Sequence, residues 1–263
     1  MKKIILLFTF ISTINSFGQL KKGIIFYGYI EALANGDANG PDSNAYMIFN
    51  KEQSYYVTAK DSLEKDEQKY GQKIYTEKNG KGGAIDVEGM KVSKHGDQVV
   101  YNIKKNTMWS SLLYRQQIYV KEICPKMNWK IEKETKKIGS LLCKKATTTF
   151  RGRTYTAWFA PDITLPYGPW KLNGLPGLIV EAYDTDKYVF WYFKNIEYPT
   201  TNKANVKYLS IPKGSTFKSY EEFKKIQKEE QNITNDKQRM VQKKFPNVIF
   251  ADPEISKMFV EIE

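Results

Sequence analysis

The sequence predicts a mainly β fold: a curved antiparallel sheet or half-open barrel, with one helical segment near the C-terminus. Two observations support this prediction. Short segments rich in aromatic and β-branched residues recur between residues 23 and 193, with turn-forming residues between them. These segments follow one another like a meander, without the alternating strands and helices that build parallel βαβ sheets. A β-sandwich is the alternative that the same pattern allows.

The first 18 residues read as a secretory signal peptide. Lys2 and Lys3 form a short positive region, an apolar run follows, and Ser16 to Gly18 supply a small-residue cleavage site. We expect cleavage after Gly18, which leaves residues 19–263 as one β-rich domain in the periplasm or at the outer surface. No later segment is apolar over the ~18 residues that a membrane-spanning helix needs, so we do not expect a transmembrane protein.

The expected strands are bounded by recognisable turns. Tyr101 and Ile103 alternate with polar neighbours, which is typical of a strand with one solvated face. A tight turn is expected around Arg151 and Gly152, and a hairpin turn after Asp184. In order, the expected strands are residues 23–33, 44–50, 53–59, 72–78, 98–104, 116–123, 128–135, 141–150, 153–161, 178–183 and 188–193.

A helical segment is expected over about 219–245. Ser219 followed by Glu222 three residues later forms a capping box, and Phe223 and Ile226 share one helix face. The stretch "NITND" contains poor helix formers, so we expect one broken helix or two, ended by Pro246.

Two cysteines remain in the exported chain, Cys124 and Cys143. An even count in an exported protein predicts one disulfide between them, worth about 3 kcal/mol for a loop of this length.

The sequence offers no catalytic, metal or cofactor site that we can assign. The single histidine, His95, stands in a turn beside Gly96, and one histidine cannot assemble a histidine-based zinc site. There is no nucleophile elbow and no phosphate-binding loop. The formal net charge of +12 favours anionic envelope surfaces as partners, and because the chain is exported we expect no nucleic-acid partner.

The stretch "GPWKLNGLPGLIVEAYD" combines glycines and a proline with large apolar residues. Residues 175–178 fit a type II turn, in which Pro176 pre-sets φ and Gly177 supplies a positive φ. Apolar neighbours would fasten this corner to the core, or they would form a binding surface. The candidate residues of the corner are Trp170, Gly174, Leu175, Pro176, Gly177, Leu178 and Ile179.

This stretch, together with "YTAWFAPDI" upstream, resembles the signature of the GLPGLI family of exported proteins from Gram-negative bacteria. Residues 174–179 match the hexapeptide without departure, and the likeness covers roughly residues 129–193. The resemblance implies export but no established activity and no catalytic residues. A fainter likeness, at the level of fold analogy, is to periplasmic lipoprotein carriers, on the order of Trp158 to Pro161 before Leu175-Pro176.

Two classes of function fit these observations. The first is an exported binding or carrier-type protein of the cell envelope, without catalytic activity or cofactor, for an apolar or amphipathic ligand or an envelope protein. The second is a carboxylate-dependent envelope hydrolase, which requires two acidic side chains facing each other. An aromatic-lined interior would favour the first, and buried facing carboxylates the second.

Overall fold

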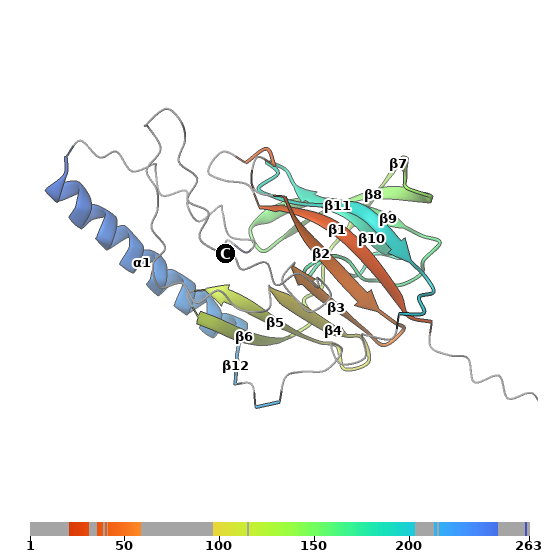
Figure 1. Cartoon of the computed structure of the whole chain (residues 1–263), viewed down its shortest axis with the longest axis horizontal. Coiled ribbons are helices and arrows are strands. Elements are labelled where there is room, and N and C mark those ends of the chain that lie inside the picture. Colours follow the sequence, from red (N-terminus) through yellow and green to blue (C-terminus); the bar gives the residue numbers. More distant parts are fainter. Residues whose placement is uncertain are drawn as a thin grey trace, which may run out of the picture.

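A single sheet of twelve strands, with one long helix beside it, is formed by the residues described in a computed structural model (Figure 1). The structure describes residues 21–31, 36–38, 40, 42–58, 97–114, 116–202, 213–214, 216–246 and 261. The strands are β1 (Gly23–Glu31), β2 (Asp42–Phe49), β3 (Gln53–Thr58), β4 (Gln98–Asn102), β5 (Thr107–Tyr114), β6 (Gln116–Ile123), β7 (Lys130–Ile138), β8 (Leu141–Phe150), β9 (Arg153–Ala160), β10 (Leu178–Asp184), β11 (Val189–Glu197) and β12 (Phe217–Lys218). The mainly β prediction is therefore confirmed.

The sheet order is β12-β6-β5-β4-β3-β2-β1-β11-β10-β9-β8-β7. Two meanders, β1 to β6 and β7 to β11, are joined where β1 pairs with β11, and only the short β12 pairs in parallel. All of these strands belong to one hydrogen-bonded ladder, so the sheet is open and continuous and is not a two-sheet sandwich. The predicted strand at 72–78, like the signal peptide and His95, lies outside the described residues.

The sheet is strongly curled. Nine strand spacings separate β6 from β8, which would be about 43 Å in a flat sheet. Nevertheless Glu122 on β6 forms an ion pair with Arg151, which directly follows β8. Only a sheet that curls around its concave face can bring these two side chains into contact. In Figure 1, β3 to β6 accordingly turn away from β7 to β11, with β1 and β2 between them.

The main core lies in the concave side of this curl and is rich in aromatic residues. Trp191 on β11 donates a hydrogen bond of 2.7 Å to the hydroxyl of Tyr56 on β3, and its ring stacks on Tyr29. Tyr56 in turn meets the edge of Trp170 from the β9–β10 connection. A second, smaller buried cluster, which includes Tyr46, lies apart from the main core.

Two local predictions hold in detail. Arg151 and Gly152 form the two-residue turn between β8 and β9, with φ of 50° and 74°, as a type I′ hairpin requires. The capping box of Ser219 and Glu222 starts the helix α1 (Tyr220–Lys244).

The expected break in this helix is wrong, because α1 runs through "NITND" without interruption. Poor helix formers each cost only ~0.7 kcal/mol or less, and the contact between Asp236 and Arg239 provides local support across one turn. Within the described part of the chain, no helix is long and apolar enough to cross a bilayer.

The predicted disulfide is also wrong, because both cysteines are free. Cys124 follows β6 near one edge of the sheet, whereas Cys143 lies in β8 near the other. The Cys124 thiol is 3.6 Å from Asn173 Oδ1, and the Cys143 thiol faces the carbonyl of Leu141. A disulfide requires Cβ atoms about 4 Å apart. Nearness in the sequence did not translate into nearness in space, because the curl brings the Phe150 end of β8 to β6, whereas Cys143 lies near the Leu141 end of that strand.

Candidate functional site

The connection between β9 and β10, residues 161–177, carries the conspicuous sequence motif, and we call it the motif loop. Backbone hydrogen bonds hold it in one conformation. Gly174 N donates to Pro166 O (3.0 Å), Leu178 N to Ile163 O (3.0 Å) and Ile179 N to the carbonyl of Tyr167 (2.8 Å). The loop is therefore a fixed part of the core and not a free surface connection.

The apolar residues of the motif lie inside the protein. Trp170, Leu175, Leu178 and Ile179 are buried, whereas Gly174 and Pro176 are exposed. The hydroxyl of Tyr27 on β1 donates to the carbonyl of Ile179 at 2.6 Å, which fastens the start of β10, directly after the loop, to the middle of the sheet. The structure thus places the large side chains of the predicted corner in the core.

The predicted role of Gly177 is wrong. Its φ lies outside the left-handed region, so residues 175–178 do not form a type II turn. A Cβ at Gly177 would instead meet the backbone of β9, at 2.4 Å from the Ala160 carbonyl oxygen. Glycine is needed there for close approach of two backbones. The positive φ of the motif belongs to Gly174, at 90°, and to Trp170, at 56°.

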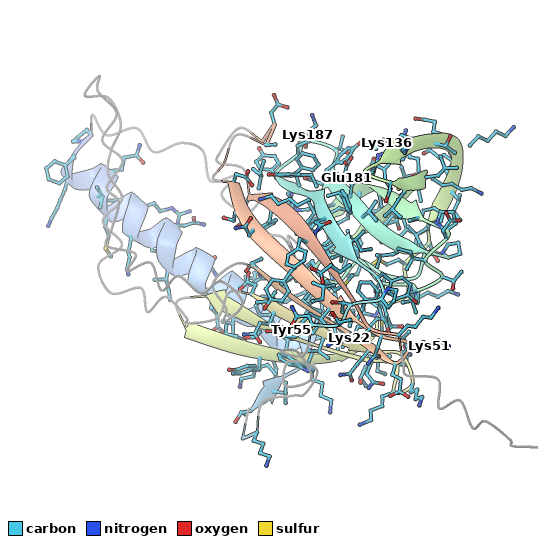
Figure 2. All side chains as sticks on the ribbon, turned by 45° about the vertical axis from the view of Figure 1, so that its right-hand side comes forward. Lys22, Lys51, Tyr55, Lys136, Glu181 and Lys187 are labelled. Carbon is cyan, nitrogen blue, oxygen red and sulfur yellow. The ribbon has the colours of Figure 1, made fainter. Side chains whose placement is uncertain are left out.

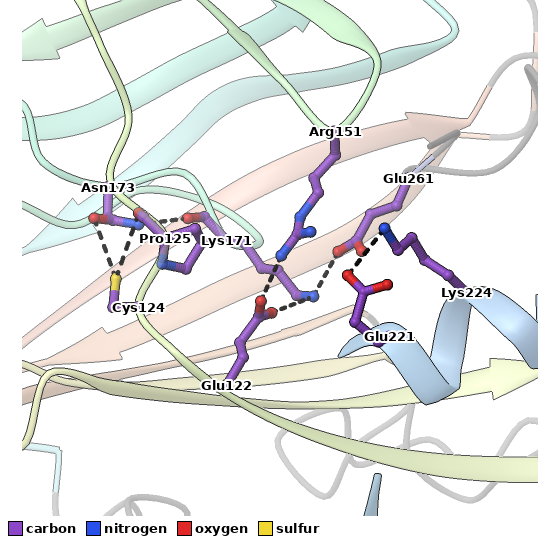
Figure 3. Close-up of polar contacts among 9 residues, drawn as sticks. All are labelled: Glu122, Cys124, Pro125, Arg151, Lys171, Asn173, Glu221, Lys224 and Glu261. Atoms are coloured by element: carbon purple, nitrogen blue, oxygen red, sulfur yellow. Dashed lines mark hydrogen bonds and ion pairs between the residues drawn. The ribbon is translucent and has the colours of Figure 1, made fainter. Parts of the chain in front are cut away.

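Lys171, between Trp170 and Leu172, is fully buried. Its ammonium lies 2.9 Å from Glu122 Oε1 and 2.6 Å from Glu261 Oε1 (Figure 3). Arg151 pairs with the other oxygen of Glu122. Glu122, Arg151, Lys171 and Glu261 together form what we call the ion cluster. It brings β6, the β8–β9 turn, the motif loop and Glu261 to one point.

Two residues at this point hold left-handed backbone conformations, and that of Trp170 is strained. The φ of Arg151 is 50°, which its hairpin turn requires, and the φ of Trp170 is 56°, in a region that bulky residues avoid. The guanidinium of Arg151 lies 3.2 Å from the ring centroid of Tyr220, at the start of α1. Such strain persists where surrounding contacts enforce it, and it is typical of functional sites.

A second group of contacts holds the backbone at Lys171 and Asn173. Asn173 Nδ2 donates to the backbone carbonyl of Lys171 at 2.8 Å, and Trp129 Nε1 donates to the backbone carbonyl of Asn173 at 2.7 Å. The Cys124 thiol borders the same asparagine, and burial raises its pKa, so it remains a neutral neighbour. The motif loop is thereby held on both sides of the lysine.

Charges elsewhere have simpler roles. Arg153 and Asp184 form a buried pair at 2.7 Å that joins β9 to the β10–β11 hairpin. Lys136 bridges to Glu181 at 2.6 Å on the sheet surface, and Figure 2 shows this pair near the top of the view, with Lys22 and Lys51 near the bottom. Lysines thus lie on the exterior both at the β7 edge and beside the central strands of the sheet.

The ion cluster can hold charge, but it lacks the features of several catalytic sites. Each of its two carboxylates faces a buried ammonium, whereas a general acid needs a carboxyl in an apolar setting. No group of three or more His, Cys, Asp or Glu able to hold a metal ion occurs among the described residues. Its cations, walled by Tyr220 and Trp170, are suited to bind an anion.

Sequence reasoning identified Trp170 beside this site but missed all four charged members. One signal was available: Lys171 is a charged residue inside a run of residues expected to be buried, where a lysine needs a partner. The partners themselves could not be named, because they come from three distant segments.

Comparison with known proteins identifies fold relatives only. No family model matches the chain, and no curated protein matches it. The chain is similar to a solved structure described as PNGF-II in space group P21, with 15% identity and a TM-score of 0.52. The match covers 78% of this chain but 32% of that one. A second structure of PNGF-II, in space group C2, matches with 14% identity, a TM-score of 0.48, and coverage of 75% and 30%. At this identity the likeness shows the β-rich fold alone.

Proposed function

We propose that this protein is an exported binding or carrier-type protein of the cell envelope that performs no catalysis. The observation that carries the proposal is the fully buried ammonium of Lys171 in a rigid loop, between two carboxylates. Buried ion pairs contribute little net stability, since apolar residues of similar volume often do as well. A buried, charge-balanced cluster is therefore better accounted for by recognition than by stability.

The rest of the chain supports the same proposal. The match of residues 174–179 to the GLPGLI hexapeptide and the predicted signal peptide favour an exported protein of that family. The proposed ligand is apolar or amphipathic, and the lysine-rich exterior suits anionic envelope components. A partner protein of the envelope is the other ligand that we propose, as an alternative to the apolar or amphipathic one.

The test is a search for what the protein carries. Residues 19–263 would be expressed with export, purified without detergent, and extracted with organic solvent for mass spectrometry. A pull-down from envelope fractions would run in parallel. We expect a bound ligand or partner that is lost in Lys171→Met and kept in the surface variant Lys51→Met, since Lys51 is exposed. Empty results from both searches would contradict the proposal.

A carboxylate-dependent hydrolase is the alternative, and one observation favours it: Glu122 and Glu261 converge on a single ammonium. In that case Glu122→Gln and Glu261→Gln would abolish turnover of a substrate found in a hydrolase panel. The matched surface variant Glu221→Gln would retain it, because Glu221 is exposed and pairs with Lys224.

A further inference from the structure

We propose that Lys171 and Arg151 form a receptor for a carboxylate, and that Glu261 fills this receptor in the present structure as an intramolecular ligand. The inference rests on the proposed binding function and names the chemical class of its ligand. A ligand carboxylate would take the position that the Glu261 carboxylate now holds.

The first argument is charge balance. Lys171 and Arg151 contribute two positive charges, and Glu122 contributes one negative charge. Without Glu261, a fully buried ammonium is left beside only half of the negative charge that balances the site. An unbalanced buried charge is strongly unfavourable, so the site requires one further monovalent anion. A carboxylate supplies that charge and can accept from an ammonium.

The second argument is that Glu122 and Glu261 are not equivalent. Glu122 is held on β6 and contacts both cations, one with each oxygen. Glu261 contacts one cation through one oxygen, and within the described part of the chain that cation is Lys171. Glu122 is therefore part of the receptor, whereas Glu261 is the replaceable member (Figure 3).

The third argument concerns what surrounds the carboxylate. The Lys171 ammonium lies 5.6 Å from the ring centroids of both Trp170 and Tyr220. Arg151 also keeps a buried Nε–H that has no acceptor among the described residues. Aromatic walls and an unused donor favour a carboxylate attached to an apolar body. A fatty acid and the C-terminal carboxylate of a short peptide share this chemistry.

The test uses chemical rescue in the chain comprising residues 19–263. Glu261→Ala should lower the Tm by roughly 6–20 °C, the loss expected when one partner of a buried ion pair is removed. Sodium acetate, titrated against sodium chloride at constant ionic strength, should restore most of that loss in a saturable manner. Hexanoate and N-acetyl-alanyl-alanine, titrated in the same way, then distinguish a fatty acid from a peptide terminus as the preferred source.

Two variants make the result specific. Glu221→Ala removes an exposed carboxylate one residue into α1, and acetate should not affect it. Lys171→Met combined with Glu261→Ala restores balance between Arg151 and Glu122. This double variant should therefore be more stable than Glu261→Ala alone and insensitive to acetate.

Three outcomes would overturn the receptor: no acetate effect on Glu261→Ala, an equal effect on Glu221→Ala, or rescue of the double variant. If Glu261→Ala does not fold, recovery of folded protein in acetate but not in chloride is the supporting result. Failure in both salts, while the double variant folds, counts against the receptor. Rescue together with an empty search for an envelope ligand would reject the proposed function and leave the receptor standing.

Discussion

Replacing Gly177 by alanine tests the structural reason for the glycine in the middle of the motif. The new Cβ would lie 2.4 Å from the Ala160 oxygen, 2.8 Å from its carbonyl carbon and 2.9 Å from Pro161 Cα. All three atoms belong to the backbone, so no side chain can rotate away. The backbones must separate by several tenths of an ångström at the point where Leu178 pairs with Ala160.

Overpacking of a well-packed region costs about 1–3 kcal/mol, and a backbone obstacle places Gly177→Ala near the upper end, at about 3 kcal/mol. For a chain of this size that corresponds to a Tm lower by about 6–12 °C. The loss would be measured by chemical denaturation and by calorimetry of residues 19–263.

Gly174 provides the matched control, because its φ is 90° and the nearest atom to an added Cβ is 4.0 Å away. Gly174→Ala should cost only the backbone penalty of about 1–2 kcal/mol. Asparagine tolerates positive φ, so Gly174→Asn should be milder than Gly174→Ala, whereas Gly177→Asn should give no relief. A neutral Gly177→Ala, or a clear improvement with Gly177→Asn, would refute the reasoning.

Three further predictions follow from buried groups. Thiol counting under denaturing, non-reducing conditions should find two free cysteines, and finding none would show that the cysteines are paired. In the native protein Cys143 should react slowly with iodoacetamide at neutral pH, because burial raises the pKa of its thiol to about 11. Asp184→Ala should lower the free energy of unfolding in urea by about 3–5 kcal/mol, since it leaves Arg153 buried without that partner and removes the acceptor for Val189 N. Asp236→Ala, in an exposed pair, should have little effect, and equal effects of the two variants would argue against a buried pair. Burial raises the pKa of Tyr27 and Tyr56 well above 10, so above about pH 10 the folded state keeps protons that the unfolded state loses. These two tyrosines should therefore leave the free energy of unfolding unchanged below about pH 10. Above that pH each tyrosine should lower it by up to about 1.4 kcal/mol per pH unit. Full ionisation of all 18 tyrosines in protein that is still folded would contradict this expectation.

The parts of the fold that could be predicted depend on local signals. The turn at Arg151 and Gly152 and the capping box at Ser219 are each decided within four residues, and both are present. Strand β5 was missed because "TMWSSLLY" lacks strict alternation, and its partners β4 and β6 determine its state. Local pattern therefore predicted element type well where it was strong, and poorly where pairing decides.

The ion cluster could not be predicted for a related reason. A lysine at position 171 signals the need for a partner but not its identity. Its partners lie at positions 122 and 261, and they meet it only because the sheet curls. The role of Gly177 was misjudged likewise, because "LPGL" fits a local turn, whereas the determining contact is with the end of β9. Contacts between distant segments produce no periodic pattern in the sequence from which they could be predicted.

The central position of β1 determines the order in which the chain can fold. This strand precedes all the other described strands in the sequence, and it is buried along most of its length. Its pairing with β2 can form at once, but its other edge must wait for β11, and Tyr27 reaches its acceptor on Ile179 across 152 residues. Closing so long a loop is slow because the entropy is lost before the contacts form. Docking of the second meander onto β1 is therefore the expected rate-limiting step, and until it occurs an apolar strand edge stays open to other chains.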